Sequence, residues 1–326
     1  MKGQYWIVSK NFDGVPKVTD FELKEEELET PKNGEILCEA LFISIDPYMR
    51  IFGNVCGATM IGEQIAKVLE SKHENFPVGS IVAMTAGWRS HTISDGSNAR
   101  LVTVPDPLPI SLALGVLGMP GGTAYFGLKH VAKVKKGEVV FVNGAAGAVG
   151  SIVGQLAKIE GCTVIGCAST EAKLNYLKEI GFDHVFNYKT QDLDKSLKDA
   201  APDGIDIFYD NVGSSASCQV LKHMKSRGRM AVCGTMAGYN DKDGPGTNQT
   251  GPLPFHDILL KELLVEGFTF WRFIDRRDEA EKALCQLIHE GKLKYKEHVY
   301  QGFDQMVTAF LDMLAAKDIG KIVVKL

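Results

Sequence analysis

The stretch Gly144-Ala-Ala-Gly147-Ala-Val-Gly150 decides the fold predicted for this chain. It lies between a buried-strand run at 138–142 and a helix predicted at 149–160. The apolar face of that helix consists of Ile152, Val153, Leu156 and Ile159. A strand, a glycine-rich turn and a helix in this order form a cradle in which a pyrophosphate rests on the helix N-terminus. The stretch therefore predicts a dinucleotide site, with close backbone approach at Gly147 and helix–strand contact at Gly150.

Outward from this turn, residues 119–290 alternate between strands and helices. Apolar runs predict further strands at 163–167, 184–186, 205–209, 229–233 and 267–270. Helices are predicted at 170–181, where Thr170 is the N-cap and Gly181 the end, and at 217–224 and 278–290. Such alternation produces a doubly wound parallel sheet with right-handed crossovers, the Rossmann fold.

The two ends of the chain follow a different pattern. Residues 1–118 contain short apolar runs bounded by Gly, Pro and Asn, which predict a β-rich domain with strands at 35–43, 64–69, 80–85 and 100–104. The tail reads strand, helix, strand (295–300, 305–316, 321–324), and we expect it to return to the first domain. The predicted domains are therefore 1–118 completed by 291–326, and 119–290. The acidic stretch 20–29 is predicted to be a solvated edge. The Gly/Pro-rich loop 240–254 is either a lid over the cofactor or a surface insertion.

The composition excludes several classes of protein. The 326 residues carry 36 Lys+Arg and 40 Asp+Glu, a net charge of −4, which argues against nucleic-acid binding because phosphate neutralisation needs a basic face. The seven cysteines are an odd number and include no Cys-x-x-Cys pair, so we expect no disulfide framework and no metal site. This pattern favours a reducing, cytoplasmic compartment. The longest uncharged run, 139–157, contains Asn143, Gln155 and four glycines, so we interpret it as strand, turn and helix and not as a membrane span.

The end of the second predicted strand indicates which dinucleotide binds. Sites for NAD place Asp or Glu there to hold the ribose 2′-OH. Here the sequence is Cys167-Ala-Ser-Thr170, with Lys173 just inside the next helix and Tyr188 after the third strand. A cation and hydroxyls suit a 2′-phosphate, which a carboxylate would repel, so we predict NADP(H). The alternative is that Lys173 is only a solvated helix residue.

With these residues in view, the chain resembles the zinc-independent medium-chain dehydrogenase/reductases, in the branch of the prostaglandin reductases (leukotriene hydroxydehydrogenases, 2-alkenal reductases). The match runs through nearly the whole chain in order. The segments that carry it are Ser44-Ile-Asp-Pro-Tyr-Met-Arg50, 87–96, 118–128, 144–150, Phe186-Asn-Tyr-Lys189, Asp210-Asn-Val-Gly213, 233–239 and Gly320-Lys321.

The resemblance implies a GroES-like catalytic domain, formed by the N-terminal part and the tail, beside the Rossmann domain. It also implies dimers through edge strands of the Rossmann sheets, with 267–270 as the candidate edge. The implied NADP contacts are Thr123, Gly147, Ala148, Val149, Gly150, Lys173, Tyr188, Asn211, Cys233, Gly234, Tyr239, Phe268, Thr269 and Phe270. Asp318 stands where the family often has an Asn that contacts the cofactor, so an amide donor is lost. Leu260 replaces a tyrosine of close relatives, and the loop 51–57 lacks their basic residues.

The implied activity is NADPH-dependent reduction of the C=C bond of α,β-unsaturated aldehydes and ketones, including 15-oxoprostaglandins and lipid-derived 2-alkenals. Adding a hydride to the β-carbon requires hydrogen-bond donors at the developing enolate and a proton for the α-carbon. Tyr48 is the candidate donor; its alternative role is that of a tyrosine at the edge of the core. Tyr239 and a ribose hydroxyl of the cofactor are further candidates. The alternative functions are an NADPH quinone reductase on the same fold and a non-catalytic NADPH-binding protein.

Overall fold

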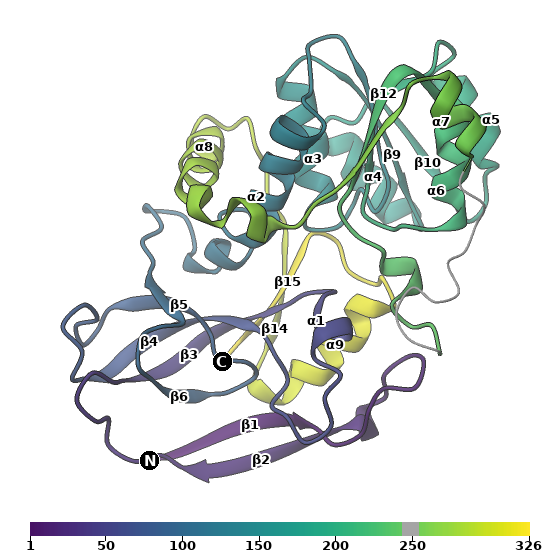
Figure 1. Ribbon diagram of the computed structural model, residues 1–326. Coiled ribbons are helices and arrows are strands. Elements are labelled where there is room, and N and C mark those ends of the chain that lie inside the picture. Colours follow the sequence, from purple (N-terminus) through teal and green to yellow (C-terminus); the bar gives the residue numbers. More distant parts are fainter. Residues whose placement is uncertain (243–253) are drawn as a thin grey trace. The chain divides into compact units, whose positions relative to one another are not determined.

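The computed structural model describes residues 1–242 and 254–326, so most of the loop predicted at 240–254 lies outside the described residues. The chain divides into two compact units (Figure 1). Unit 1 consists of Met1–Gly115 and Glu297–Leu326, and unit 2 of Val116–Lys296. Unit 1 therefore contains both ends of the described chain, whereas unit 2 is one continuous segment.

Unit 2 is built on a six-stranded parallel sheet with the order β10-β9-β8-β11-β12-β13. Its strands are β8 (Val139–Val142), β9 (Thr163–Ala168), β10 (His184–Asn187), β11 (Ile205–Asp210), β12 (Met224–Val232) and β13 (Leu264–Gly267). Counted along the chain, this order is 3-2-1-4-5-6, so the predicted doubly wound fold is confirmed. The order reverses between β8 and β11, which is where open α/β sheets bind their ligands.

The helices of unit 2 connect these strands. They are α2 (Met119–Phe126), continued by the π-helix η3 (Gly127–Val131), then α3 (Gly150–Ile159), α4 (Glu171–Glu179), α5 (Leu193–Ala200), α6 (Ser215–Val220) with the 3₁₀ turn η4 (Leu221–His223), η5 (Met236–Gly238), α7 (Phe255–Leu260), η6 (Phe270–Arg276) and α8 (Arg277–His289). Within residues 1–242 and 254–326, no helix has the length and apolar character needed to cross a membrane.

Three sequence predictions for unit 2 are wrong. The sixth strand is Leu264–Gly267 and not 267–270, because Phe268 and Phe270 turn into the core after the strand ends. Ile159 is 39% exposed at the last position of α3, although Ile152, Val153 and Leu156 are buried as expected. The helix predicted at 217–224 ends earlier, since Met224 already begins β12.

Unit 1 contains a seven-stranded sheet and a hairpin. The sheet has the order β14-β15-β3-β4-β5-β7, with β6 paired to β3. Its strands are β3 (Ile36–Ile45), β4 (Glu63–Ser71), β5 (Ile81–Thr85), β6 (His91–Ser94), β7 (Ala99–Leu101), β14 (Glu297–Gln301) and β15 (Lys321–Lys325). The hairpin pairs β1 (Lys2–Val8) with β2 (Phe21–Glu27), which is the acidic stretch. The remaining elements are α1 (Met49–Phe52), α9 (Met306–Leu314) and the 3₁₀ turns η1 (Val18–Asp20), η2 (Ile110–Leu114) and η7 (Phe303–Gln305).

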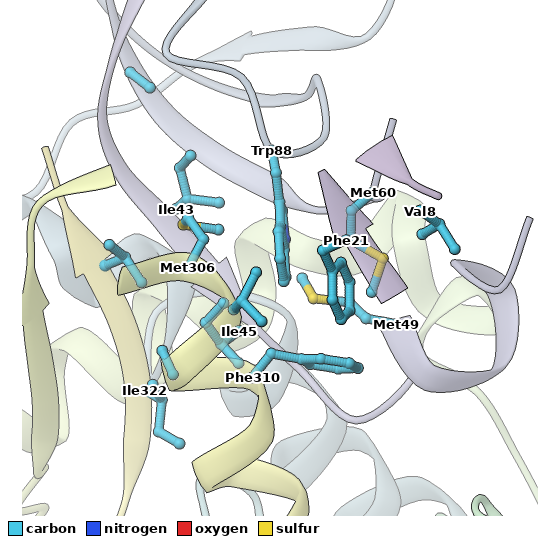
Figure 2. Packing of buried hydrophobic residues seen from close by; sticks show 14 of the residues in the cluster. Val8, Phe21, Ile43, Ile45, Met49, Met60, Trp88, Met306, Phe310 and Ile322 are labelled. Atoms are coloured by element: carbon cyan, nitrogen blue, oxygen red, sulfur yellow. The ribbon is translucent and has the colours of Figure 1, made fainter. Parts of the chain in front are cut away.

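The tail is part of the core of unit 1. β15 pairs antiparallel with β3, so that Ile322 lies opposite Ile45. Figure 2 shows the apolar cluster in which these residues pack with Met49, Trp88 and Phe310. The Trp88 ring stacks on Phe21 at 5.7 Å and meets the edge of Phe310 at 5.8 Å. Each fully buried apolar side chain of this kind contributes roughly 1.5–3 kcal/mol, so the tail holds the strand before Tyr48 and the helix after it.

Candidate active site

The glycine-rich turn follows β8 and leads into α3. The Gly147 N–H donates to the Gly144 carbonyl at 3.1 Å, and Gly144 has a φ of 56°, a left-handed conformation that glycine adopts readily. A Cβ on Gly150 would lie 2.5 Å from the Gly144 oxygen, so only glycine fits there. Among the described residues, no side chain caps the N-terminus of α3. The Ser151 N–H donates to the Gly147 carbonyl and the Ile152 N–H to the Val149 carbonyl, so an anion at this turn would meet the N–H groups at 148–150, and the turn fits a pyrophosphate.

A buried hydrogen-bond network joins the ends of β8 and β11 at the reversal point of the sheet. Asn143 donates from Nδ2 to Asp210 Oδ1 at 2.5 Å and accepts from the Asn211 N–H at 2.7 Å. The N–H groups of Val212 and Gly213 also donate to Asp210 Oδ1, each at 2.9 Å. Asp210 Oδ2 is buried without a hydrogen-bond partner in the described part of the chain. The network fixes Asn211 at the carboxyl edge of the sheet.

Lys173 lies in the first turn of α4, after β9, and Tyr188 follows β10. The Thr170 side chain caps α4 by accepting from the Lys173 N–H. The Lys173 residue is only 7% exposed, which contradicts its reading as a solvated helix residue. The Tyr188 N–H donates to the Ala168 carbonyl at 3.2 Å, which holds Tyr188 beside the end of β9, and Tyr188 is 52% exposed. The end of β9, Ala168, thus carries no carboxylate, and a buried lysine and an exposed tyrosine follow β9 and β10.

The segment after β12 is tied to the same edge of the sheet. The N–H groups of Cys233 and Gly234 donate to the Asp210 carbonyl at 2.8 and 3.2 Å. Burial raises the pKa of the Cys233 thiol to about 12, so the thiol is neutral near pH 7. Burial also raises the pKa of Tyr239, whose hydroxyl therefore stays protonated.

The Thr123 hydroxyl donates within α2, to the Met119 carbonyl at 2.8 Å.

The three residues after β13 differ in their surroundings. Phe268 lies edge-on to Tyr209, with ring centroids 6.2 Å apart, and Phe270 packs against Gly122 of α2. Both phenylalanines are buried, whereas Thr269 between them is exposed. Thr269 is therefore the residue of this segment whose side chain is free to meet a ligand.

Tyr48 and Asp318 lie in unit 1. Tyr48 precedes α1 and packs against the apolar cluster that contains Met49 and Trp88, and the residue is half-buried. Burial, followed by the carboxylates of Asp46 and Glu63, raises the pKa of Tyr48 above its ordinary value. Its hydroxyl can therefore donate a hydrogen bond but does not ionise in the working range of pH. In Asp318, Oδ1 lies 2.5 Å from Nδ1 of His298. The other carboxylate oxygen, Oδ2, is buried without a hydrogen-bond partner in the described segments.

Sequence reasoning missed the residues that hold this site together. Asn143 and Asp210 organise the carboxyl edge of unit 2, and Asp46, two residues before Tyr48, pairs with Lys321. The only available signal for Asn143 is a polar residue at the end of a strongly apolar strand. Within the described ranges, no three His, Cys, Asp or Glu side chains gather in a group that could hold a metal ion.

Two family models match the chain. Residues 4–102 match the N-terminal domain of oxidoreductases, and residues 148–290 match a model described as zinc-binding dehydrogenase.

Individual relatives match over almost the full length. Prostaglandin reductase 1 of Oryctolagus cuniculus is 48% identical, covering 98% of this chain and 93% of its own. The NADP⁺-dependent 2-alkenal reductase of Nicotiana tabacum is 37% identical over 98% of this chain and 96% of its own. The crystal structure of CurA from Vibrio vulnificus in complex with NADPH superposes with a TM-score of 0.92 at 33% identity, covering 99% of this chain and 98% of that one.

Proposed function

The chain belongs to the zinc-independent medium-chain dehydrogenase/reductases, in the prostaglandin reductase and 2-alkenal reductase branch, and we infer from this that it is an NADPH-dependent oxidoreductase. It reduces the C=C bond of α,β-unsaturated aldehydes and ketones. The observation that carries this conclusion is the full-length similarity to a prostaglandin reductase and to an NADP⁺-dependent 2-alkenal reductase. We further propose that the substrates include 15-oxoprostaglandins and lipid-derived 2-alkenals.

We propose that the residues of unit 2 described above hold the cofactor. The backbone N–H groups of Ala148, Val149 and Gly150 fit the pyrophosphate, and Gly147 lets the backbone approach it closely. The Lys173 ammonium group and the Tyr188 hydroxyl supply the charge and the donor that a 2′-phosphate requires. Further contacts are assigned to Thr123, Asn211, Cys233, Gly234, Tyr239, Phe268, Thr269, Phe270 and, in unit 1, Asp318. When bound, NADPH supplies the hydride that the β-carbon of the substrate accepts.

Tyr48 is assigned to the carbonyl oxygen of the substrate. Negative charge grows on this oxygen as the β-carbon is reduced, and a fixed hydroxyl stabilises such charge by donating a hydrogen bond. The raised pKa keeps the proton on Tyr48, so the residue binds and stabilises the enolate and does not deliver its proton. This assignment leaves the proton of the α-carbon to come from another donor.

Replacing Tyr48 with phenylalanine is expected to slow hydride transfer about 100-fold, because the loss of one such donor typically costs this much. The measurement is the single-turnover oxidation of NADPH by 2-nonenal and by a 15-oxoprostaglandin, with the saturated carbonyl product identified. A matched control is Tyr5→Phe in β1, which changes a tyrosine of the same unit outside the assigned site. An unchanged rate in Tyr48→Phe removes Tyr48 as a donor.

The same assay separates the alternative functions. If the wild-type protein turns over only quinones and forms semiquinone, it is a quinone reductase. If it binds NADPH but oxidises it with none of the enals, enones and quinones, it is a binding protein.

We propose that the protein is a homodimer that pairs the β13 edges of two Rossmann sheets. β13 is the last strand of its sheet, and its Leu264 and Val265 are 47% and 41% exposed. An exposed apolar edge strand of this kind favours pairing with a second chain. Val265→Lys is expected to give a monomer in sedimentation equilibrium, whereas Val78→Lys, on an exposed valine of unit 1, should leave the mass unchanged. A dimeric Val265→Lys protein would contradict the proposal.

We also propose a cytoplasmic location. All seven cysteines carry free thiols, which fits a reducing compartment. Fractionation of cells that express the full chain would test this, and recovery in an oxidising compartment would refute it.

A further inference from the structure

We propose that Lys321, in the last strand of the chain, is the positioning residue for Tyr48, because it fixes the two residues that lead into the Tyr48 turn. The inference rests on the role of Tyr48 in the proposed function. It concerns a residue that touches Asp46 and the backbone, and not the substrate.

The Lys321 ammonium group is buried against the end of β3. Nζ donates to the Ile45 carbonyl at 2.6 Å and to Asp46 Oδ1 at 2.9 Å. The Ser44 hydroxyl donates to the other oxygen of the Asp46 carboxylate, so both of its oxygens are held. The side chains of Lys321 and Asp46 are 5% and 6% exposed. Because a buried ion pair keeps its geometry only while both partners are present, Lys321 holds Ile45 and Asp46 in one position.

Two backbone hydrogen bonds connect Asp46 to the turn that contains Tyr48, which follows Asp46 by two residues. The Met49 N–H donates to the Asp46 carbonyl at 3.2 Å, and the Arg50 N–H donates to the Pro47 carbonyl at 3.0 Å. Asp46 thus begins the turn whose last hydrogen bonds form α1, and Tyr48 stands inside it. A shift of Asp46 therefore shifts the Tyr48 Cα as well.

The neighbours of all three residues are clamped in one apolar cluster (Figure 2). Ile45 precedes Asp46, Met49 follows Tyr48, and Ile322 follows Lys321. All three of these apolar residues belong to that cluster. Burial of these neighbours brings the three segments together, but apolar packing has no direction. The direction comes from the ammonium group, which aligns the Ile45 carbonyl and the Asp46 carboxylate.

Lys321 also serves a second carboxylate. Glu297 of β14 lies opposite Lys321 in the pairing register of the two strands. The Ser111 hydroxyl donates to Glu297 Oε2 at 2.8 Å, while Oε1 is buried with no partner in the part of the chain described. Burial raises the pKa of Glu297 above its ordinary value, against the smaller lowering effects of the Ser111 hydrogen bond and then of the Lys321 charge. A neutral side chain at position 321 would leave the carboxylates of Asp46 and Glu297 without this nearby cation.

The test is a double-mutant cycle between Lys321 and Tyr48, read as the single-turnover rate of hydride transfer to 2-nonenal at saturating NADPH. Lys321→Met is expected to lower the rate at least 10-fold, with the dissociation constant for NADPH unchanged in fluorescence titration. In the Tyr48→Phe background, Lys321→Met is expected to cause no further loss, because its effect passes through Tyr48. The control is Lys325→Met, which removes an exposed lysine from the same strand and should leave the rate unchanged.

The double variant Asp46→Asn/Lys321→Met removes both buried charges and keeps the test decisive if Lys321→Met alone does not fold. Its rate is expected to remain low, because no ammonium group then aligns the Ile45 carbonyl and the side chain at position 46. A wild-type rate in this double variant overturns the inference, as does a loss that multiplies with that of Tyr48→Phe. A wild-type rate in Tyr48→Phe alone removes the assignment of Tyr48 together with the inference, so the two failures can be told apart.

Discussion

Gly150→Ala is expected to raise the dissociation constant for NADPH about 100-fold and to lower the free energy of unfolding by about 1–3 kcal/mol. The added Cβ would lie 2.5 Å from the Gly144 oxygen and 2.8 Å from the Ala145 Cα, and both are backbone atoms that cannot rotate away. The start of α3 must therefore move from the end of β8. This movement misaligns the N–H groups assigned to the pyrophosphate, and charge-assisted bonds of this kind contribute roughly 1.5–3 kcal/mol each.

Fluorescence titration with NADPH and urea unfolding measure the two effects separately. Gly267→Ala is the matched control, since a Cβ there would meet no atom within 4 Å among the described residues. Gly150→Ala with wild-type NADPH affinity would show that the turn does not hold the pyrophosphate, whatever the change in stability.

The second large effect is a change of cofactor preference. Lys173→Glu is expected to raise KM for NADPH about 100-fold while changing KM for NADH little. The substitution removes the cation assigned to the 2′-phosphate and places a negative charge where the phosphate would lie, whereas NADH has only a hydroxyl there. The loss of a hydrogen bond to a charged group, about 1.5–3 kcal/mol, supports a change of this size before repulsion is added.

Steady-state kinetics with both cofactors and one enal checks this expectation. Because Lys173 is buried, a glutamate could also weaken α4, so Lys173→Met separates charge from packing and should show a smaller effect in the same direction. Lys178→Glu introduces the same charge at an exposed position of the same helix and should change neither KM. Equal increases for NADPH and NADH would refute the assignment of Lys173.

The dinucleotide turn and most of unit 2 could be predicted because their signals are local. Strand, turn and helix follow one another around Gly147, and Thr170 caps its helix three residues before Lys173. The apolar runs of β8, β9 and β11 are long enough to locate the strands within a residue or two. In a doubly wound fold, these elements also fix the edge at which the ligand binds.

Features that depend on distant partners could not be predicted. The burial of Lys173 and the use of Asp210 as an acceptor for three N–H groups follow from tertiary contacts. The sixth strand was misplaced because the apolar residues after Gly267 belong to the core contacts of α2 and β11, and not to the sheet. Asp46 reads as an ordinary residue before proline until β15 brings Lys321 against it.

The placement of β15 between β14 and β3 has a consequence for synthesis of the chain. Unit 2 is continuous and can fold as soon as its last residue leaves the ribosome. β3 has to wait for its neighbour, because Lys321 follows Asp46 by 275 residues. During translation residues 42–45 of β3 therefore lack their partner on one side, and their N–H and C=O groups offer a template to other nascent chains. Unit 1 matures last although it is made first, and its exposure to aggregation ends only when the final strand arrives.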